Sequence, residues 1–192
     1  SAQYSGGCAY NNTMDSPRFF CPLPLAAGSM VSLPENAARH AARALRLGPG
    51  DAVTLFDGRG GEFTARIVTV RKEQVEAELL ERRERECESP LRVTLAQALQ
   101  AGDKMDLTVQ KAVELGVVAV QPLAARRSVV RLDGERAVKR VEHWRGVAAS
   151  ACEQCGRNRL PSVAEVLPLD RWLAALGSSQ PGEARLMLAP GA

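Results

Sequence analysis

Polar side chains that could do chemistry are concentrated at the end of a long predicted helix, in residues 152–159. Glu153 and Gln154 offer a carboxylate and an amide, and Arg157 and Arg159 offer guanidinium groups that bind anionic oxygens. This combination is typical of a polar binding site, with Glu153 as a candidate proton acceptor. Cations at a helix end also complement the negative end of the helix dipole, so a purely structural interpretation stays open.

Two cysteines, Cys152 and Cys155, lie in the same segment with the spacing Cys-x-x-Cys. A zinc site needs a second pair of cysteine or histidine ligands, and His40 and His143 are isolated in the sequence. A thiol-redox site needs the pair at the start of a helix, where the dipole lowers the thiol pKa, whereas this pair closes a helix. We therefore predict structural cysteines and no metal, and the thiol-redox alternative rests on this spacing alone.

Arginines gather on the first predicted helix, where Arg39, Arg43 and Arg46 recur at helical spacing with His40 beside them. Three guanidinium groups on one face make a phosphate-binding edge, because arginine forms bidentate bonds to phosphate oxygens. Arg18, near the start of the first domain, adds a further cation. The competing interpretation is an ordinary solvated face, which is the usual meaning of charge on an isolated helix.

The second half of the chain contributes Lys104 and Lys111, on one face of a helix predicted over residues 103–115, and Arg127. Arg127 follows a strand predicted over residues 117–123, and the carboxyl ends of parallel strands are where active sites are usually built. An ordinary amphipathic helix explains the two lysines equally well.

The composition is that of a globular protein, with 45% hydrophobic and 24% charged side chains in 192 residues. The net charge of +3 is too small to prove nucleic-acid binding by itself, and the 4% aromatic content argues against stacking platforms for single-stranded nucleic acid. Five cysteines form no paired framework, and no apolar run approaches the roughly 20 residues that span a bilayer. We expect a cytoplasmic protein with reduced thiols and no membrane association.

The first half of the chain is predicted to be mostly strand. Short alternating segments at residues 30–33, 52–56, 62–70 and 74–80 are typical of half-buried antiparallel strands. One helix is predicted over residues 35–47, and the glycines at 58, 60 and 61 form a turn. These elements predict a small β-barrel that carries one helix.

The charged residues 81–88 have no apolar face, which favours a solvated linker and places a domain boundary there. Strands and helices then alternate, which predicts an α/β domain with a parallel sheet. Its apolar stripe on the helix over residues 134–155 consists of Val141, Trp144, Ala148, Ala151 and Cys155. The predicted elements are strands at 91–98, 117–123 and 184–188 and helices at 103–115, 134–155 and 169–176.

Taken in order, several short segments resemble the bacterial RsmE-type methyltransferases, which methylate N3 of a uridine in 16S ribosomal RNA. Each segment is weak alone, and the ordered set, which spans residues 14–192, is specific. The segments are Pro17-Arg18-Phe19-Phe20, residues 40–50, Leu55-Phe56-Asp57-Gly58, Lys104 with Gln110-Lys111, Glu114-Leu115-Gly116-Val117, Pro122 with Arg127-Ser128, and residues 152–159.

The resemblance implies a PUA-like RNA-binding barrel at residues 14–88, followed at residues 89–192 by a SPOUT methyltransferase domain. That fold contains a deep trefoil knot, binds S-adenosylmethionine and usually forms a homodimer. The family's donor-binding motifs, a Gly-Pro-Glu-Gly-Gly loop and a later Leu-Arg-x-Glu-Thr stretch, are expected beyond Ala192. The chain as given is therefore expected to lack the knot-forming end and to be inactive, and residues 1–13 are expected to be a tag or an upstream extension.

The resemblance also implies how the polar residues would act on 16S ribosomal RNA or on the assembled small ribosomal subunit. Catalysis is assigned to Arg127, Glu153 and Gln154. Phosphate contacts are assigned to Arg18, Arg39, His40, Arg43, Arg46, Lys104, Lys111, Arg157 and Arg159. The alternative function is a non-catalytic RNA-binding module in which the barrel is the working part.

Overall fold

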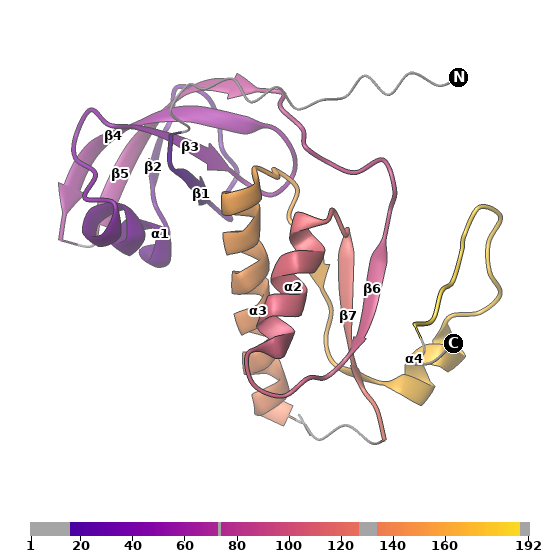
Figure 1. Ribbon diagram of the computed structural model, residues 1–192. Helices are drawn as coiled ribbons and strands as arrows, with labels where there is room; N and C mark the ends of the chain where they lie inside the picture. The colour runs from indigo at the N-terminus through magenta and orange to yellow at the C-terminus, as the bar shows by residue number, and fades with distance from the viewer. Residues whose placement is uncertain (1–15, 73, 127–133, 189–192) are drawn as a thin grey trace.

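The computed structural model describes residues 16–72, 74–126 and 134–188. The N-terminal part is a five-stranded sheet with the strand order β1-β3-β4-β5-β2, rolled into the barrel of Figure 1. Its strands are β1 (Arg18–Phe20), β2 (Met30–Ser32), β3 (Ala52–Phe56), β4 (Glu62–Arg71) and β5 (Gln74–Arg83). Every second side chain of β5 from Val75 to Leu79 is buried, because successive side chains of a strand point to opposite faces.

The barrel helix differs from the prediction. An α-helical part, α1 (Glu35–Arg39), continues as the π-helical η1 (His40–Ala44), and Arg46 then adopts a positive φ of 53°. The Leu45 N–H donates to the His40 carbonyl, and the Leu47 N–H reaches back to the Ala41 carbonyl. The helix therefore ends in a wide turn, and the Leu47 side chain beyond it packs against the barrel core. The prediction of a single helix over residues 35–47 is wrong at its end, because the helix stops at Ala44.

Strand β5 extends further than predicted, through Arg83, so the expected linker at 81–88 begins inside the sheet. Its last residues pair with the start of β4, where Glu62 lies opposite Arg83. The alternation of side chains gave no sign of this, because both faces of β5 are exposed beyond Leu79. Backbone pairing with a neighbouring strand, which a sequence pattern cannot show, holds this extension in place.

The second part is a parallel sheet covered by two long helices. Its central strand is β7 (Ala119–Ala124). The strands that pair with β7, all in parallel, are β6 (Thr94–Ala98), β8 (Ser162–Val163) and β9 (Leu167–Pro168). The helices α2 (Lys104–Glu114) and α3 (Gly134–Cys155) lie side by side against the sheet (Figure 1). Their shared core includes Met105, Val109, Val113, Val141, Trp144 and Ala148.

The topology gives the two helices a common direction. Each follows a strand and precedes another parallel strand, so each begins at the carboxyl edge of the sheet and runs back toward its amino edge. The end of α3 therefore approaches the barrel, where it contacts β1. The start of α3 lies at the far end of the molecule in Figure 1.

Three details of the second part correct the sequence predictions. The buried stripe of α3 ends with Cys152, and the predicted Cys155 is only half-buried. A short helix α4 (Leu169–Ala175) forms as expected, but residues 184–188 are not a strand. Leu186, Met187 and Leu188 are 92%, 88% and 98% exposed. No described strand forms backbone hydrogen bonds with this segment, and a strand needs such a neighbour whatever its apolar pattern. Among the described residues, no helix combines the length and apolar character needed to cross a membrane.

Candidate functional site

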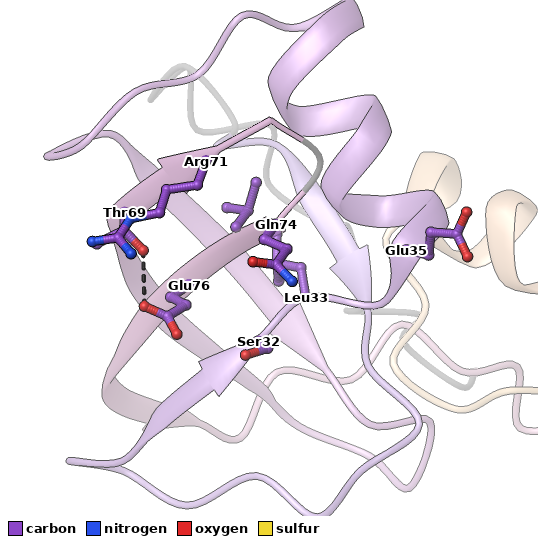
Figure 2. Close-up of a pocket in the computed structure, with 8 residues that line it drawn as sticks. Ser32, Leu33, Glu35, Thr69, Arg71, Gln74 and Glu76 are labelled. Carbon is purple, nitrogen blue, oxygen red and sulfur yellow. Dashed lines mark hydrogen bonds between the residues drawn. The ribbon is translucent and has the colours of Figure 1, made fainter.

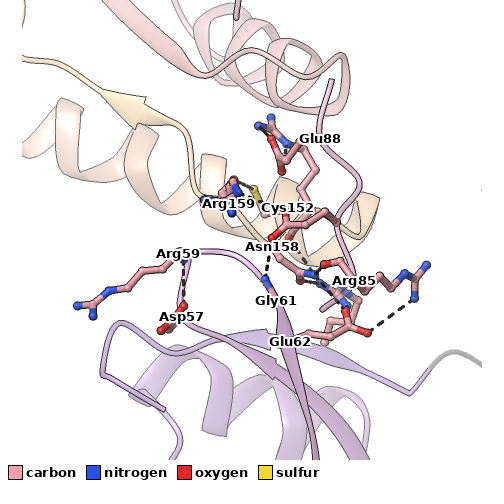
Figure 3. Close-up of polar contacts among 12 residues, drawn as sticks. Asp57, Arg59, Gly61, Glu62, Arg85, Glu88, Cys152, Asn158 and Arg159 are labelled. Atoms are coloured by element: carbon pink, nitrogen blue, oxygen red, sulfur yellow. Dashed lines mark hydrogen bonds and ion pairs between the residues drawn. The ribbon is translucent and has the colours of Figure 1, made fainter. Parts of the chain in front are cut away.

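The polar segment after α3, residues 156–160, lies between the barrel and the parallel sheet and forms the joint of the two parts (Figure 3). It pairs with the turn between β3 and β4: the Gly60 N–H donates to the Asn158 carbonyl at 3.2 Å, and the Leu160 N–H donates to the Gly58 carbonyl at 3.0 Å. Arg59 and Arg159 face each other in an antiparallel bridge between these two bonds. The chain therefore continues strand-like pairing from one domain into the other.

Asn158 is the centre of the joint and is fully buried. Its Nδ2 donates to the Arg85 carbonyl at 2.6 Å, and its Oδ1 accepts a hydrogen bond from Arg18 Nη2 at 2.6 Å. Arg18 also forms an ion pair with Glu62 at 2.5 Å, and its guanidinium lies 5.1 Å from the centre of the Phe56 ring. A buried charge is tolerated when it is paired and hydrogen-bonded in this way. Arg18, assigned to RNA from the sequence, is thus committed to the joint.

Arg157 is also buried rather than presented to a ligand, with 3% of its side chain exposed. Its guanidinium forms two hydrogen bonds with the Glu88 carboxylate, at 3.1 and 2.6 Å. It also donates to two backbone carbonyls. One belongs to Val113, in the last turn of α2, and the other to Val117, just after the helix. Arg157 therefore caps α2 and fastens it to the interdomain segment, which matches the structural interpretation of the cations here.

Glu153 connects α3 to the first strand of the barrel. Its Oε1 accepts a hydrogen bond from the Phe20 N–H at 2.9 Å. Burial raises the pKa of its carboxyl, while the bond from Phe20 and the charges of His40 and Arg18 lower it in part. Gln154, the next residue, is exposed. Neither lies near the carboxyl edge of the sheet, because α3 runs its full 22 residues from that edge to the joint.

The two cysteines of this segment have the environment predicted for structural residues. Cys152 is fully buried, and its burial, followed by the neighbouring Cys155, raises its pKa to about 12. A thiol that resists ionisation is a poor nucleophile, so the thiol-redox alternative finds no support. Within the described part of the chain, no cluster of three histidine, cysteine or acidic side chains could hold a metal ion.

The cations of the barrel helix do not all lie on the helix. Arg39 forms an ion pair with Glu35, Arg43 follows it in the π-helical segment, and Arg46 lies beyond the helix end. The His40 ring packs edge-on against Phe19 with the ring centres 5.9 Å apart. Their assignment to RNA stays a prediction.

The remaining assigned residues lie at separate places. Lys104 begins α2 and is exposed, whereas Lys111 forms an ion pair with Glu114 at 2.7 Å, which lowers the pKa of that glutamate. Arg159 is 57% exposed and pairs with Glu86 at 3.3 Å. Arg127 lies outside the described residues. The structure thus unites Arg18, Glu153 and Arg157 at the joint, and leaves the lysines of α2 apart from them.

Sequence reasoning missed Glu62, Arg85, Glu88 and Phe56 as parts of this joint. The glycines of the turn are a sign that another segment approaches it, but they point to none of these four residues. A Cβ at Gly60 would lie 2.5 Å from Glu86 Oε1 and 2.6 Å from Arg159 Nη2, and a Cβ at Gly58 would lie 3.1 Å from the Leu160 side chain. Glycine is needed where another segment approaches this closely.

A separate open pocket of about 470 Å³ lies on the barrel, beside the tip of the hairpin between β4 and β5 (Figure 2). Leu33 and Val75 are its buried apolar residues, and Thr69 donates to Glu76 at 2.8 Å on its rim. Its lining residues are Ser32, Leu33, Glu35, Thr69, Arg71, Gln74, Val75 and Glu76. Two carboxylates against one guanidinium make this pocket unsuited to a phosphate group.

The carboxyl edge of the parallel sheet is the place where a methyl donor would be sought. Its described amide side chains already bond within the chain: Gln97 and Gln121 donate to backbone carbonyls, and Gln100 accepts from Thr108. Leu99 and Leu123 are buried packing residues. These residues alone do not make a nucleoside site, so we assign no donor ligand among them.

Comparison with protein families defines the class. A family model of the RNA methyltransferase domain matches residues 87–192, and one of the RNA methyltransferase PUA domain matches residues 33–80. The chain therefore belongs to the RNA methyltransferases that carry a PUA domain. The α/β fold class, with a PUA-like barrel before a parallel sheet typical of SPOUT methyltransferases, is confirmed.

Individual relatives narrow the family to the RsmE type and confirm that resemblance. The ribosomal RNA small subunit methyltransferase E of Bacillus subtilis is 34% identical over 135 residues, which are 70% of this chain and 53% of the relative. The Synechocystis enzyme of the same name is 32% identical over 74% of this chain and 45% of its own length. The chain thus spans about half the length of these curated relatives.

Solved structures of methyltransferases have the same fold as this chain. The Neisseria gonorrhoeae ribosomal RNA small subunit methyltransferase E, bound to S-adenosyl methionine, superposes with a TM-score of 0.80 at 46% identity, over 85% of this chain and 67% of that one. A putative methyltransferase from Legionella pneumophila, also with bound cofactor, gives a TM-score of 0.82 at 36% identity, over 84% and 67% of the two chains. The division between residues 88 and 89 and the individual site residues stay predictions.

Proposed function

We propose that this protein belongs to the enzyme system that methylates N3 of a uridine in 16S ribosomal RNA of the small ribosomal subunit, in the cytoplasm and as a homodimer. The observation that carries the proposal is the likeness to the Neisseria gonorrhoeae enzyme with its bound methyl donor, which extends over both domains. The relatives' names supply the ribosomal RNA substrate.

The joint suggests what this chain contributes to the reaction. Phe20 and Phe56 from the barrel pack in the core of the parallel sheet, and the buried Arg18–Glu62–Asn158 contacts fix the two parts together. RNA held on the barrel is then held at a constant position relative to the sheet. Such positioning accelerates a transfer between two bound reactants by removing their relative motion in advance.

The chemistry requires the proton of uridine N3 to leave before the nitrogen can attack. S-adenosylmethionine, when bound, supplies the methyl group. Loss of the N3 proton leaves a negative charge that spreads onto the flanking carbonyl oxygens of the base, where guanidinium or N–H donors stabilise it until methyl transfer to N3 neutralises it. Arg127, which follows β7 in the sequence and lies outside the described residues, is our proposed donor to these oxygens. Glu153 and Gln154 lie at the end of α3 away from the carboxyl edge of the sheet, so we propose positioning of the barrel, rather than proton transfer, as the role of Glu153.

The test mixes the 192-residue chain with radiolabelled S-adenosylmethionine and small ribosomal subunits that lack the modification. Methyl transfer to a uridine of 16S ribosomal RNA, located by primer extension, supports the proposal. Binding of subunits without transfer supports the non-catalytic RNA-binding module instead. Absence of both binding and transfer contradicts both functions for this chain.

A further inference from the structure

The first half of α3 carries three cations on one side: Arg136, Lys139 and Arg140. Residues three and four positions apart are neighbours on a helix surface, so these side chains share a face. Arg136 and Lys139 are exposed and Arg140 is half-buried. Across the described residues, no carboxylate forms an ion pair with any of the three.

Two of the three acids nearest to this face have other partners. Glu142 lies three positions after Lys139 but forms an ion pair with Arg145. Asp106 of α2 accepts hydrogen bonds from the Trp144 indole at 3.1 Å and contacts the His143 ring at 2.7 Å. Glu135 lies one turn before Lys139 and is the acid in the first turn of the helix. The face therefore keeps a net positive charge, which we name the α3 cationic face (Arg136, Lys139 and Arg140).

Helix stability accounts for these cations only in part. The start of a helix carries the positive end of its dipole, which disfavours a cation in the first turn, where Arg136 lies, but does not reach Lys139 and Arg140 in the second turn. Glu135 favours the helix start and lies four positions before Lys139, which is a helix-stabilising arrangement. An anionic partner that binds at the start of α3 would compensate Arg136 and Arg140, which this arrangement does not explain.

The position of the face points to the nature of that partner. Strand β7 ends at Ala124, and the exposed Arg126 follows it at the same edge of the sheet where α3 begins. Ligands of open parallel sheets bind beyond the carboxyl ends of the strands. In an RNA methyltransferase, a polyanion must approach this edge during the reaction, and lysine and arginine neutralise its phosphates.

We propose that the α3 cationic face binds phosphates of the ribosomal RNA substrate, as a contact surface separate from the barrel and at the opposite end of α3. The inference rests on the proposed function. It concerns the phosphate backbone only, since three exposed cations position RNA without selecting a base sequence.

The test measures binding of a fluorescein-labelled 16S ribosomal RNA fragment to the full chain at several salt concentrations. We expect the variant Arg136→Ala/Lys139→Ala/Arg140→Ala to bind about 10- to 100-fold more weakly at low salt. We also expect the slope of log affinity against log salt to become shallower by about two, because each lost phosphate contact removes roughly 0.7 to 0.9 of slope. Alanine has a high helix propensity and removes a cation from the first turn, which offsets the loss of the Glu135–Lys139 arrangement, so the melting temperature should change little.

The matched control compares two single substitutions of exposed arginines. Arg136→Ala removes a charge from the α3 cationic face, whereas the control Arg92→Ala removes one from the opposite, amino edge of the sheet. We expect only Arg136→Ala to change the slope. If the unaltered chain binds the RNA and the triple variant keeps its affinity and slope, the inference is overturned while the proposed function stands. If the unaltered chain does not bind the RNA at all, the proposed function itself fails.

Discussion

The side chains of Arg18 and Asn158 meet at 2.6 Å although 140 positions of sequence separate them. The contact joins the first strand of the barrel to the segment after α3, inside a network of buried polar groups. Apart from Arg18 Nε, which has no hydrogen-bond partner among the described residues, the buried side-chain atoms of this network are paired, so the joint behaves as part of the folded core rather than as a flexible linker. The stability of this protein should therefore respond strongly to changes at a place that looks like a polar surface in the sequence.

Replacement of Asn158 by alanine should destabilise the protein by about 1 to 3 kcal/mol, because the Arg85 carbonyl loses its bond from Asn158 and Arg18 Nη2 keeps only a 3.5 Å contact with the Arg157 carbonyl. The measurement is urea denaturation followed by circular dichroism. The control is Gln154→Ala in the same segment, where the exposed side chain should change stability by less than about 0.5 kcal/mol. Equal effects of the two substitutions would contradict the structural role of Asn158.

The ion pair between Arg18 and Glu62 should show strong coupling in a double-mutant cycle. Arg18→Met alone leaves the Glu62 carboxylate in a site where 5% of its side chain is exposed, and loss of one partner from such a buried pair costs about 3 to 5 kcal/mol. Glu62→Leu alone should cost a similar amount. The double variant should be less destabilised than the sum of the two, and strict additivity would rule out the coupling.

A side chain at position 60 should loosen the turn between β3 and β4. In Gly60→Ala the new Cβ would push aside the ends of the Glu86 and Arg159 side chains, which breaks their ion pair and the bond from the Gly61 N–H to Glu86, and φ is +110°. Gly50→Ala is the matched control, since φ there is +96° with nothing within 4 Å of the added atom. Both variants are strained, but Gly60→Ala should lower the melting temperature further by a few degrees, equivalent to about 0.5 to 1.5 kcal/mol. Calorimetry of the two variants measures this difference, and equal melting temperatures would contradict it.

Glu153→Gln should increase stability at neutral pH while keeping the bond to the Phe20 N–H. Burial raises the pKa of the Glu153 carboxyl above 4.5, so the folded state favours the protonated form. This contribution is fully present below pH 4.5 and is lost as pH rises through the raised pKa. The glutamine variant does not ionise, so its unfolding free energy relative to that of the unaltered chain should increase as pH rises from 4.5 through the raised pKa of Glu153. A variant that is less stable at pH 7 than the unaltered chain would contradict this assignment.

Periodicity predicted the elements whose partners are close in sequence. The helix α3 has the predicted bounds, and the buried stripe from Val141 to Ala151 follows its spacing. The alternation of β5 also predicted its buried face as far as Leu79. These patterns are local because each is fixed by the geometry of one helix or one hairpin.

The joint could not be predicted in the same way. Whether Arg157 faces RNA or Glu88 depends on contacts across 69 positions of sequence, and no pattern within either segment encodes them. The strand expected at 184–188 fails for a related reason, because its apolar residues say nothing about which edge they pair with. The ordered resemblance to the RsmE type predicted the fold class correctly, since it draws on the whole chain at once.

Helix α3 fixes the distance between the α3 cationic face and the barrel. Lys139 lies 16 residues before the last residue of the helix, Cys155, and each residue adds about 1.5 Å, so the face and the barrel end of α3 lie roughly 24 Å apart. Under the proposed function, a short oligonucleotide would reach either the barrel or the face at one time. Folded ribosomal RNA, which holds its own shape over that distance, would contact both together and gain from their combined effective concentration.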